Sequence, residues 1–146
     1  MCRYWCFIAL FMMLVPSPSS AEPFDENCPT SDVSMYRLLA VPDHFHKCFV
    51  RTIGFVSLEF EGTAIYPHLE DVCRRVPRNG IWLDFFGSDR DALDMDSEFK
   101  GGYALVAGTF NAEGRGHFGM FSGSITKIER VQRWFNPDLT ECPESQ

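Results

Sequence analysis

The chain has 146 residues, with 13 Lys and Arg against 20 Asp and Glu, which gives a formal charge of −7. This length suits one domain, and 45% hydrophobic residues exclude a wholly disordered chain. No apolar run of about 20 residues follows the N-terminus, which argues against a protein with several membrane-spanning helices. The negative charge argues against non-specific nucleic-acid binding, because that affinity comes from neutralising phosphates.

The first 21 residues have the layout of a secretory signal peptide. Arg3 precedes a short apolar run, Pro16 breaks the run, and small residues lead to a cleavage point after Ala21. The alternative is a buried N-terminal helix. We therefore predict an exported protein, periplasmic or extracellular, without a stable membrane anchor. Its predicted parts are a cleaved signal peptide, a flexible arm, a barrel domain and a polar C-terminal tail, at residues 1–21, 22–31, 32–131 and 132–146.

Four cysteines remain after the predicted cleavage: Cys28, Cys48, Cys73 and Cys142. In an oxidising compartment an even number of cysteines predicts disulfides, here two, with three possible connectivities. Zinc is the competing interpretation. Zinc sites usually contain closely spaced Cys or His pairs, whereas the gaps here are wide, so the sequence favours disulfides.

Residues 32–41 predict one short amphipathic helix. Val33, Tyr36, Leu39 and Ala40 recur at helical spacing and should form its buried face. Ser31 or Asp32 could cap its N-terminus, and Pro42 should end it.

From Cys48 onward the pattern favours strands. Five strands are expected, with an irregular, charged excursion at 67–80, a bulge near Ser122 and Gly123, and a helix-sized insert within 87–100. The expected strands cover residues 48–60, 63–66, 81–86, 103–110 and 117–131. This element order is typical of an OB-fold, so the predicted fold is mainly β: a five-stranded OB-like Greek-key barrel with one short N-terminal helix.

Four stretches carry a resemblance to a known group of proteins. They read VRTIGFVSLEFEGTAIY, NGIWLDF, GGYALVAGTFN and GHFGMFSGSI. Together they resemble an uncharacterised family of small secreted bacterial proteins with an OB-fold-like barrel, over roughly residues 33–131. The resemblance implies the fold and export, and it carries no activity.

The first hairpin suggests how the cysteines pair. If Glu61 and Gly62 form the turn, Cys48 faces position 75, which is two residues from Cys73. We therefore expect a Cys48–Cys73 bridge, and Cys28–Cys142 follows by elimination. The excursion after the second strand could instead carry Cys73 elsewhere.

Two short clusters offer groups for acid–base or metal chemistry. His68, Glu70 and Asp71 supply an imidazole and two carboxylates. His44 and His46 would point to the same side of an extended segment, as metal ligands do. Nothing in the sequence fixes the geometry of the first cluster, so a solvated loop is its preferred interpretation. The second cluster has no visible third ligand, so a polar lead-in to the first strand is preferred there.

The remaining polar motifs predict no catalytic residue, no metal and no cofactor. An acidic run within residues 87–100 departs from the EF-hand pattern, because counting from Asp94 places Phe99 where that pattern requires glycine. A solvated, acidic connection is the preferred interpretation, and a weak, irregular calcium site is the alternative. His117 lies between glycines at the mouth of the last hairpin, where close approach of a ligand is possible. Ser122 and Ser124 are not in a nucleophile elbow.

The aromatic residues suggest a binding role. OB-folds bind along strands two and three, which here carry Tyr66 and Trp82. With His68 and His117 they form the predicted ligand-binding set, and the alternative is that the two aromatics are barrel core. The sequence thus favours a non-catalytic binding module for an envelope protein or a small ligand. A metal-assisted hydrolase and a structural subunit of an envelope assembly are the alternatives, and the oligomeric state stays open.

Overall fold

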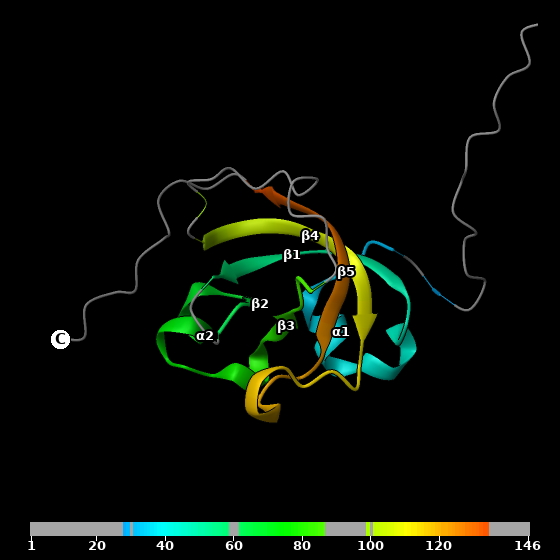
Figure 1. The fold of residues 1–146 in the computed structure, drawn as a ribbon, viewed down its shortest axis with the longest axis horizontal. Helices are drawn as coiled ribbons and strands as arrows, with labels where there is room; N and C mark the ends of the chain where they lie inside the picture. The colour runs from blue at the N-terminus through cyan, green and yellow to red at the C-terminus, as the bar shows by residue number, and fades with distance from the viewer. Residues whose placement is uncertain (1–27, 30, 59–61, 87–98, 100, 135–146) are drawn as a thin grey trace, which may run out of the picture.

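The computed structural model describes residues 28–29, 31–58, 62–86, 99 and 101–134. Its five strands close into one barrel in the order β1-β2-β3-β5-β4. The strands are β1 (Phe49–Ser57), β2 (Ala64–Tyr66), β3 (Ile81–Leu83), β4 (Gly101–Asn111) and β5 (Ser124–Arg133). Figure 1 shows β1 and β4 side by side along the barrel, with α2 beside β2. The predicted mainly β, five-stranded barrel is confirmed.

The alternation of β1 explains how this strand serves the barrel. Val50 and Val56 are fully buried, whereas Phe49 and Ile53, of the opposite parity, are about two-fifths exposed. Gly54 lies where β1 passes β2, and a Cβ there would be 2.5 Å from the carbonyl oxygen of Tyr66. A side chain at residue 54 would therefore force the two strands apart.

The predicted N-terminal helix exists, but it buries a different face. Helix α1 covers Met35–Ala40, and its N-cap is Ser34, whose Oγ accepts a hydrogen bond from the Arg37 N–H at 3.4 Å. The capping role predicted for Ser31 or Asp32 is therefore wrong. Met35 and Leu38 are buried, while Tyr36 is 60% exposed. The helix is too short for its hydrophobic period to fix the buried face, and contact with the barrel decides it.

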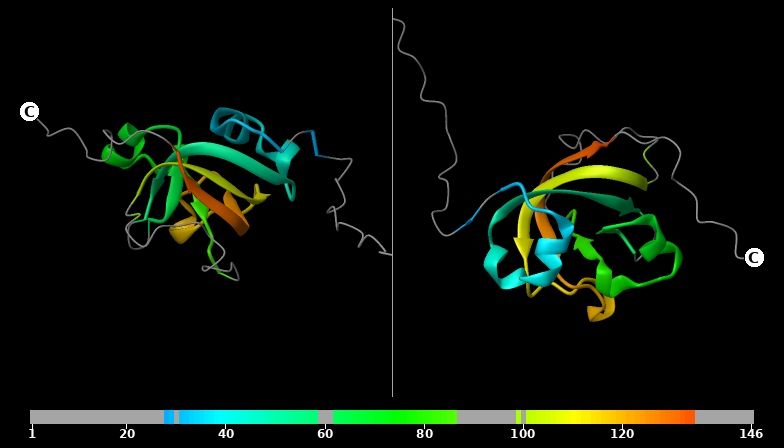
Figure 2. Two further views of the ribbon diagram at one scale, coloured as in Figure 1. Left: turned by 90° about the horizontal axis from the view of Figure 1, so that it is seen from above. Right: turned by 180° about the vertical axis from the view of Figure 1, so that it is seen from behind.

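The turn after α1 supplies one large side chain, Phe45, to the core. Pro42 opens a 3-10 helix, η1 (Pro42–Phe45), rather than simply ending the structure. Phe45 and Leu38 are fully buried and belong to the same core cluster as the barrel residues Val50, Val106 and Ile125. In the view from behind in Figure 2, α1 and η1 lie in front of the barrel. The helical segment thus covers one side of the barrel.

The excursion after β2 is more ordered than expected. It contains helix α2 (Leu69–Cys73) and a second 3-10 helix, η2 (Pro77–Asn79). The last hairpin also differs, because residues His117–Gly119 form a 3-10 turn, η3, and β5 starts later. The irregularity in the β4–β5 ladder lies between the pairs Ala107–Arg130 and Thr109–Thr126, not near Ser122 and Gly123.

The described disulfide joins Cys28 to Cys48. Cys73 is also disulfide-bonded, so the predicted Cys48–Cys73 and Cys28–Cys142 pairings are wrong. The observed β1–β2 register, if continued, would place Cys73 opposite Cys48. However, β2 ends at Tyr66, and the chain turns at Pro67 into α2. Cys28 reaches Cys48 instead because the segment after it runs alongside β1, where Asp32 bridges to Arg51.

Several sequence predictions concern residues outside the described set. These are the signal peptide at 1–21, most of the arm at 22–31, nearly all of the helix-sized insert within 87–100, and the tail beyond residue 134. Within the described residues, no helix is both long and apolar enough to cross a membrane.

Thr52 gives a first testable prediction. Its side chain is 2% exposed, and its hydroxyl has no hydrogen-bond partner among the described residues. Thr52→Val keeps the shape and removes a buried polar group, so we expect the free energy of unfolding to rise by about 1 kcal/mol. Urea denaturation followed by circular dichroism measures this change.

Thr126 is the matched control for Thr52. Its hydroxyl donates a hydrogen bond to the carbonyl oxygen of Thr109 at 3.3 Å. Thr126→Val should therefore lower the free energy of unfolding, by about 0.5 to 1 kcal/mol. A Thr52→Val protein that is less stable than the parent would contradict the assignment of an unsatisfied hydroxyl.

Candidate functional site

The two aromatics of the predicted binding face lie in one small cluster outside the barrel. Tyr66 packs with Ala64 and Phe121, and Trp82 and Val72 lie against them. The rings of Trp82 and Phe121 are 5.3 Å apart at a tilt of 57°. Tyr66 is 7% exposed, whereas Trp82 is half-buried.

The chain itself covers this face. Gly80, just after η2, lies directly over the Tyr66 ring, because an added Cβ would be 2.6 Å from Tyr66 Cε1. Gly116, at a φ of 59°, lies equally close to Trp82, with 2.7 Å from an added Cβ to Cγ. The sequence predicted the 67–80 excursion as an irregular, charged segment. The structure places it over Tyr66, so little of that ring is open.

His117 and His68 lie on two different segments, η3 and the start of α2. His117 lies in η3 with its ring centroid 3.9 Å from that of Phe118, which is 81% exposed. His68 is the N-cap residue of α2, and its Nε2 lies 2.6 Å from the hydroxyl oxygen of Tyr36. Within the predicted ligand-binding set, Tyr66 and Trp82 share one cluster, His68 lies beside Tyr36, and His117 follows Gly116, which lies against Trp82.

In the two clusters considered for metal chemistry, several side chains instead form hydrogen bonds with other parts of the fold. Asp71 accepts a hydrogen bond from the Asn79 side chain at 2.7 Å, while His68 contacts Tyr36. His46 Nδ1 accepts the Ala112 N–H at 3.2 Å and so connects the end of η1 to the end of β4. His44 lies inside η1, so the extended geometry expected for the His44 and His46 pair does not form. In the described parts of the chain, no group of three or more His, Cys, Asp or Glu could hold a metal ion.

A cleft of about 550 Å³ lies elsewhere, between the start of α1 and the outer face of the barrel. Its volume is in the range of small-molecule sites. The lining comes from the segment leading into α1, from β1, β4 and the end of β5, and from one proline after β2. The lining residues are Asp32, Val33, Ser34, Met35, Tyr36, Arg51, Thr52, Ile53, Pro67, Leu105 and Trp134.

Three large side chains in the cleft walls are exposed to solvent. Tyr36 is 60% exposed, Trp134 49% and Ile53 41%. Ile53 and Leu105 are opposite each other in the β1–β4 pair. Trp134 follows β5 and is held there by its N–H, which donates to the Tyr103 carbonyl oxygen at 2.8 Å. Val33 and Met35 are buried and support the cleft from below.

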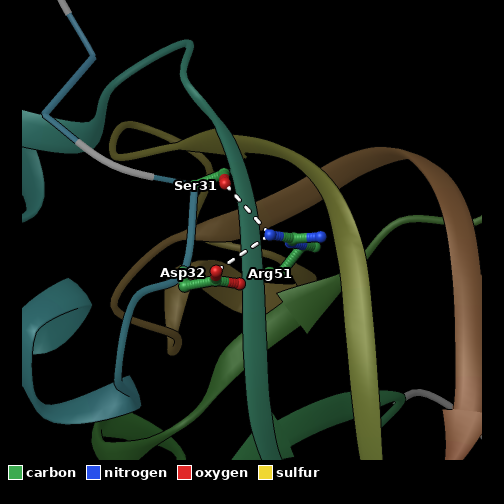
Figure 3. A network of polar contacts seen from close by, with 3 residues as sticks. All are labelled: Ser31, Asp32 and Arg51. Carbon is green, nitrogen blue, oxygen red and sulfur yellow. Dashed lines mark hydrogen bonds and ion pairs between the residues drawn. The ribbon is translucent and has the colours of Figure 1, made fainter.

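One end of the cleft is polar, and its two charged side chains form an ion pair with each other. Arg51 forms an ion pair with Asp32 at 2.8 Å and lies 3.4 Å from Ser31 Oγ. Figure 3 shows this network, with the Ser31 and Asp32 segment running beside β1. Both side chains of the pair are exposed, so the ion pair adds little stability. The charges of Arg51 and Asp32 compensate each other at this end of the cleft.

Sequence reasoning missed this cleft because two of its residues were assigned elsewhere. Tyr36 was placed on the buried face of the helix, and Trp134 fell in the predicted polar tail. The adjacent aromatics Trp134 and Phe135, within a mostly polar stretch, were the available signal for Trp134. Ile53 carried no signal, because both parities of its strand are apolar.

Replacing Trp82, which is packed, should cost more stability than replacing Trp134, which is half exposed. Trp82→Ala should lower the free energy of unfolding by about 2 kcal/mol, because the ring packs on Phe121 and Gly116. Trp134→Ala should change it by less than about 0.5 kcal/mol, because half of that side chain is exposed. Thermal and urea denaturation of both variants test this. Equal losses in the free energy of unfolding would contradict the conclusion that Trp82 is packed and Trp134 is exposed.

A comparison of the chain with protein-family models, with curated proteins and with solved structures finds no match. The resemblance to a family of small secreted bacterial proteins therefore stays a prediction.

Proposed function

We propose that the protein is an exported, non-catalytic binding module whose ligand occupies the cleft beside α1. The observation that carries this proposal is the exposure of Tyr36, Ile53 and Trp134 around one mainly apolar cleft. Exposed apolar side chains that gather in a concave site, with a few polar groups, are typical of ligand-binding surfaces.

The chemistry of the walls favours an uncharged, partly apolar ligand. Arg51 and Asp32 neutralise each other at the polar end. The hydroxyl of Tyr36 is held near His68 Nε2, which fixes the orientation of its ring. Such a site suits a small apolar molecule or an apolar side chain of another protein.

Export is supported by the cysteines. The Cys28–Cys48 disulfide is a bond that persists in oxidising compartments. Together with the signal-like N-terminus this supports a periplasmic or extracellular location.

A binding experiment with small probes tests the proposed cleft. The oxidised full chain, labelled with ¹⁵N, is titrated with uncharged aromatic and aliphatic fragments, with indole as the reference probe. We expect saturable shifts of the Ile53, Leu105 and Trp134 amide signals. Trp134→Ala should weaken binding at least tenfold, whereas Trp82→Ala should leave the affinity within about twofold. Shifts centred on Trp82, or no saturable shift with any fragment, would overturn the proposal.

A further inference from the structure

The hydrogen bonds of β1 fix the direction in which its main-chain groups point. The Phe110 N–H donates to the Cys48 carbonyl oxygen at 2.9 Å. The main-chain N–H and C=O groups of the even-numbered residues of β1 therefore point toward β4. Arg51 instead bonds on the other side, where its carbonyl oxygen accepts the Val33 N–H at 3.0 Å and its N–H donates to Ser31. In antiparallel pairing these directions alternate strictly. The N–H and C=O of Ile53 therefore point away from β4, toward the same edge as those of Arg51.

In the described part of the chain, main-chain hydrogen bonds or strand pairing cover that edge of β1 on both sides of Ile53 but not at Ile53. On one side the segment 31–33 bonds to Arg51. On the other side β2 pairs with β1, beginning at Phe55 and Tyr66. Beyond Tyr66 the chain turns at Pro67, which has no N–H to offer. Within the described residues, no main-chain hydrogen bond crosses this edge to Ile53.

The same position opens into the cleft. Arg51, Thr52 and Ile53 line it from β1, Val33 from the covering segment and Pro67 from the end of β2. Between Arg51 and Phe55 the strand rises about 13 Å, which is the length of about three to four extended residues. A donor and acceptor pair without partners among the described residues thus lies next to the exposed side chains of Tyr36 and Trp134.

We propose that the ligand of the cleft is a short extended peptide segment with an aromatic or large aliphatic side chain. One residue of the peptide exchanges both main-chain hydrogen bonds with Ile53, as an added strand does at a sheet edge. Its side chain lies against Tyr36, Ile53 and Trp134. This inference rests on the proposed function, because it assigns a ligand class to the same cleft.

The hydrogen-bonding pattern is what favours a peptide over other apolar ligands. A hydrocarbon or lipid chain would fill the apolar walls but would leave the Ile53 N–H and C=O facing it without partners, which costs binding energy. A residue of an extended peptide offers an acceptor and a donor at the matching spacing. The neutral Arg51 and Asp32 pair does not call for a charged side chain at that end.

A selection experiment tests the peptide class directly. A display library of random linear hexapeptides is selected on the oxidised full chain, with the Tyr36→Ala and Trp134→Ala double variant as the counter-target. We expect enriched peptides that share an aromatic or large aliphatic residue. In the complex with an enriched peptide, the Ile53 amide should shift and exchange with solvent at least tenfold more slowly. No enrichment over the counter-target would overturn the proposal.

Two sets of changes isolate the main-chain contact. Ile53→Pro removes the N–H together with the side chain, so it is compared with Ile53→Ala, which removes the side chain alone. The proline variant should bind the enriched peptide at least tenfold more weakly than Ile53→Ala. Phe49→Pro is the matched control, because Phe49 has the same parity on the same strand and lies outside the cleft lining, and it should keep the affinity within about twofold. If Ile53→Pro does not fold, N-methylation of the peptide decides, and one methylated position should cost at least tenfold. Equal binding by every methylated peptide would overturn the inference.

The outcomes separate this inference from the proposed function. If fragments bind in the cleft and no peptide does, the proposed function stands and the peptide assignment fails. If neither binds, both fail. If the Ile53 amide shifts with protein concentration alone and the chain elutes as a dimer, a second copy occupies the edge and the peptide assignment is overturned.

Discussion

Phe45→Ala is expected to lower the free energy of unfolding by about 3 to 5 kcal/mol. Phe45 is fully buried at the end of η1 and packs in the cluster that fills the barrel. The Arg37 guanidinium carbon lies 5.4 Å from the centre of its ring, so a cation–π contact is lost as well. Removing a buried phenyl ring costs its transfer free energy and leaves a cavity that the barrel cannot collapse to fill.

Phe86→Ala is the control for Phe45→Ala. Phe86 is 94% exposed, so the same substitution there should change the free energy of unfolding by less than about 0.5 kcal/mol. Chemical denaturation of both variants under oxidising conditions gives the comparison. A loss below about 1 kcal/mol for Phe45→Ala would show that η1 does not fill the barrel as described.

Replacing both Cys28 and Cys48 by Ala is expected to cost about 3 kcal/mol. The bond closes a loop across a sequence separation of 20 residues, and the loop-closure entropy lost by the unfolded chain gives this magnitude. The double variant is preferred to reduction, because Cys73 is also disulfide-bonded and a reductant would break both bonds. Guanidinium denaturation of the variant and the parent, both kept oxidised, measures the difference.

Arg51→Gln provides the comparison for the disulfide. Arg51 connects the same segment to β1 through its ion pair with Asp32, but both side chains are exposed. That variant should lose less than about 1 kcal/mol. If the two variants lost equal stability, the covalent bond would not be the main restraint on this segment.

Peptide mapping of the native protein should recover a Cys28–Cys48 linked fragment.

The strands were predictable because their signals are local. Alternating apolar residues around Val50, Val56 and Val106, separated by glycine-containing turns, predicted where strands lie, and five such segments predicted the barrel. Their exact ends depend on pairing partners, so β5 begins at Ser124 rather than at His117. The loop before it closes against Trp82 and Phe121, which a strand pattern does not reveal.

The candidate site was not predictable, because its parts come from distant segments. Tyr66 and Trp82 carried the aromatic signal, but the chain between them folds back over Tyr66. The cleft joins Tyr36, Ile53 and Trp134, which are brought together by the pairing of β1 with β4 and of β4 with β5. The Cys28–Cys48 bond likewise depends on a segment that runs beside β1, not on the first hairpin.

The sequence by itself determined a mainly β, five-stranded barrel preceded by one short helix, because hydrophobic period and turn residues act over a few neighbouring positions. Only the tertiary structure decided which face of that helix is buried, how Cys28 and Cys48 pair, and which aromatics remain open. Those outcomes depend on competition among distant surfaces for contact with the same barrel. The surroundings of Ile53 were decided in the same way: among the described residues, pairing with β2 begins at Phe55 and Tyr66, and the bonds to the N-terminal segment lie at Arg51.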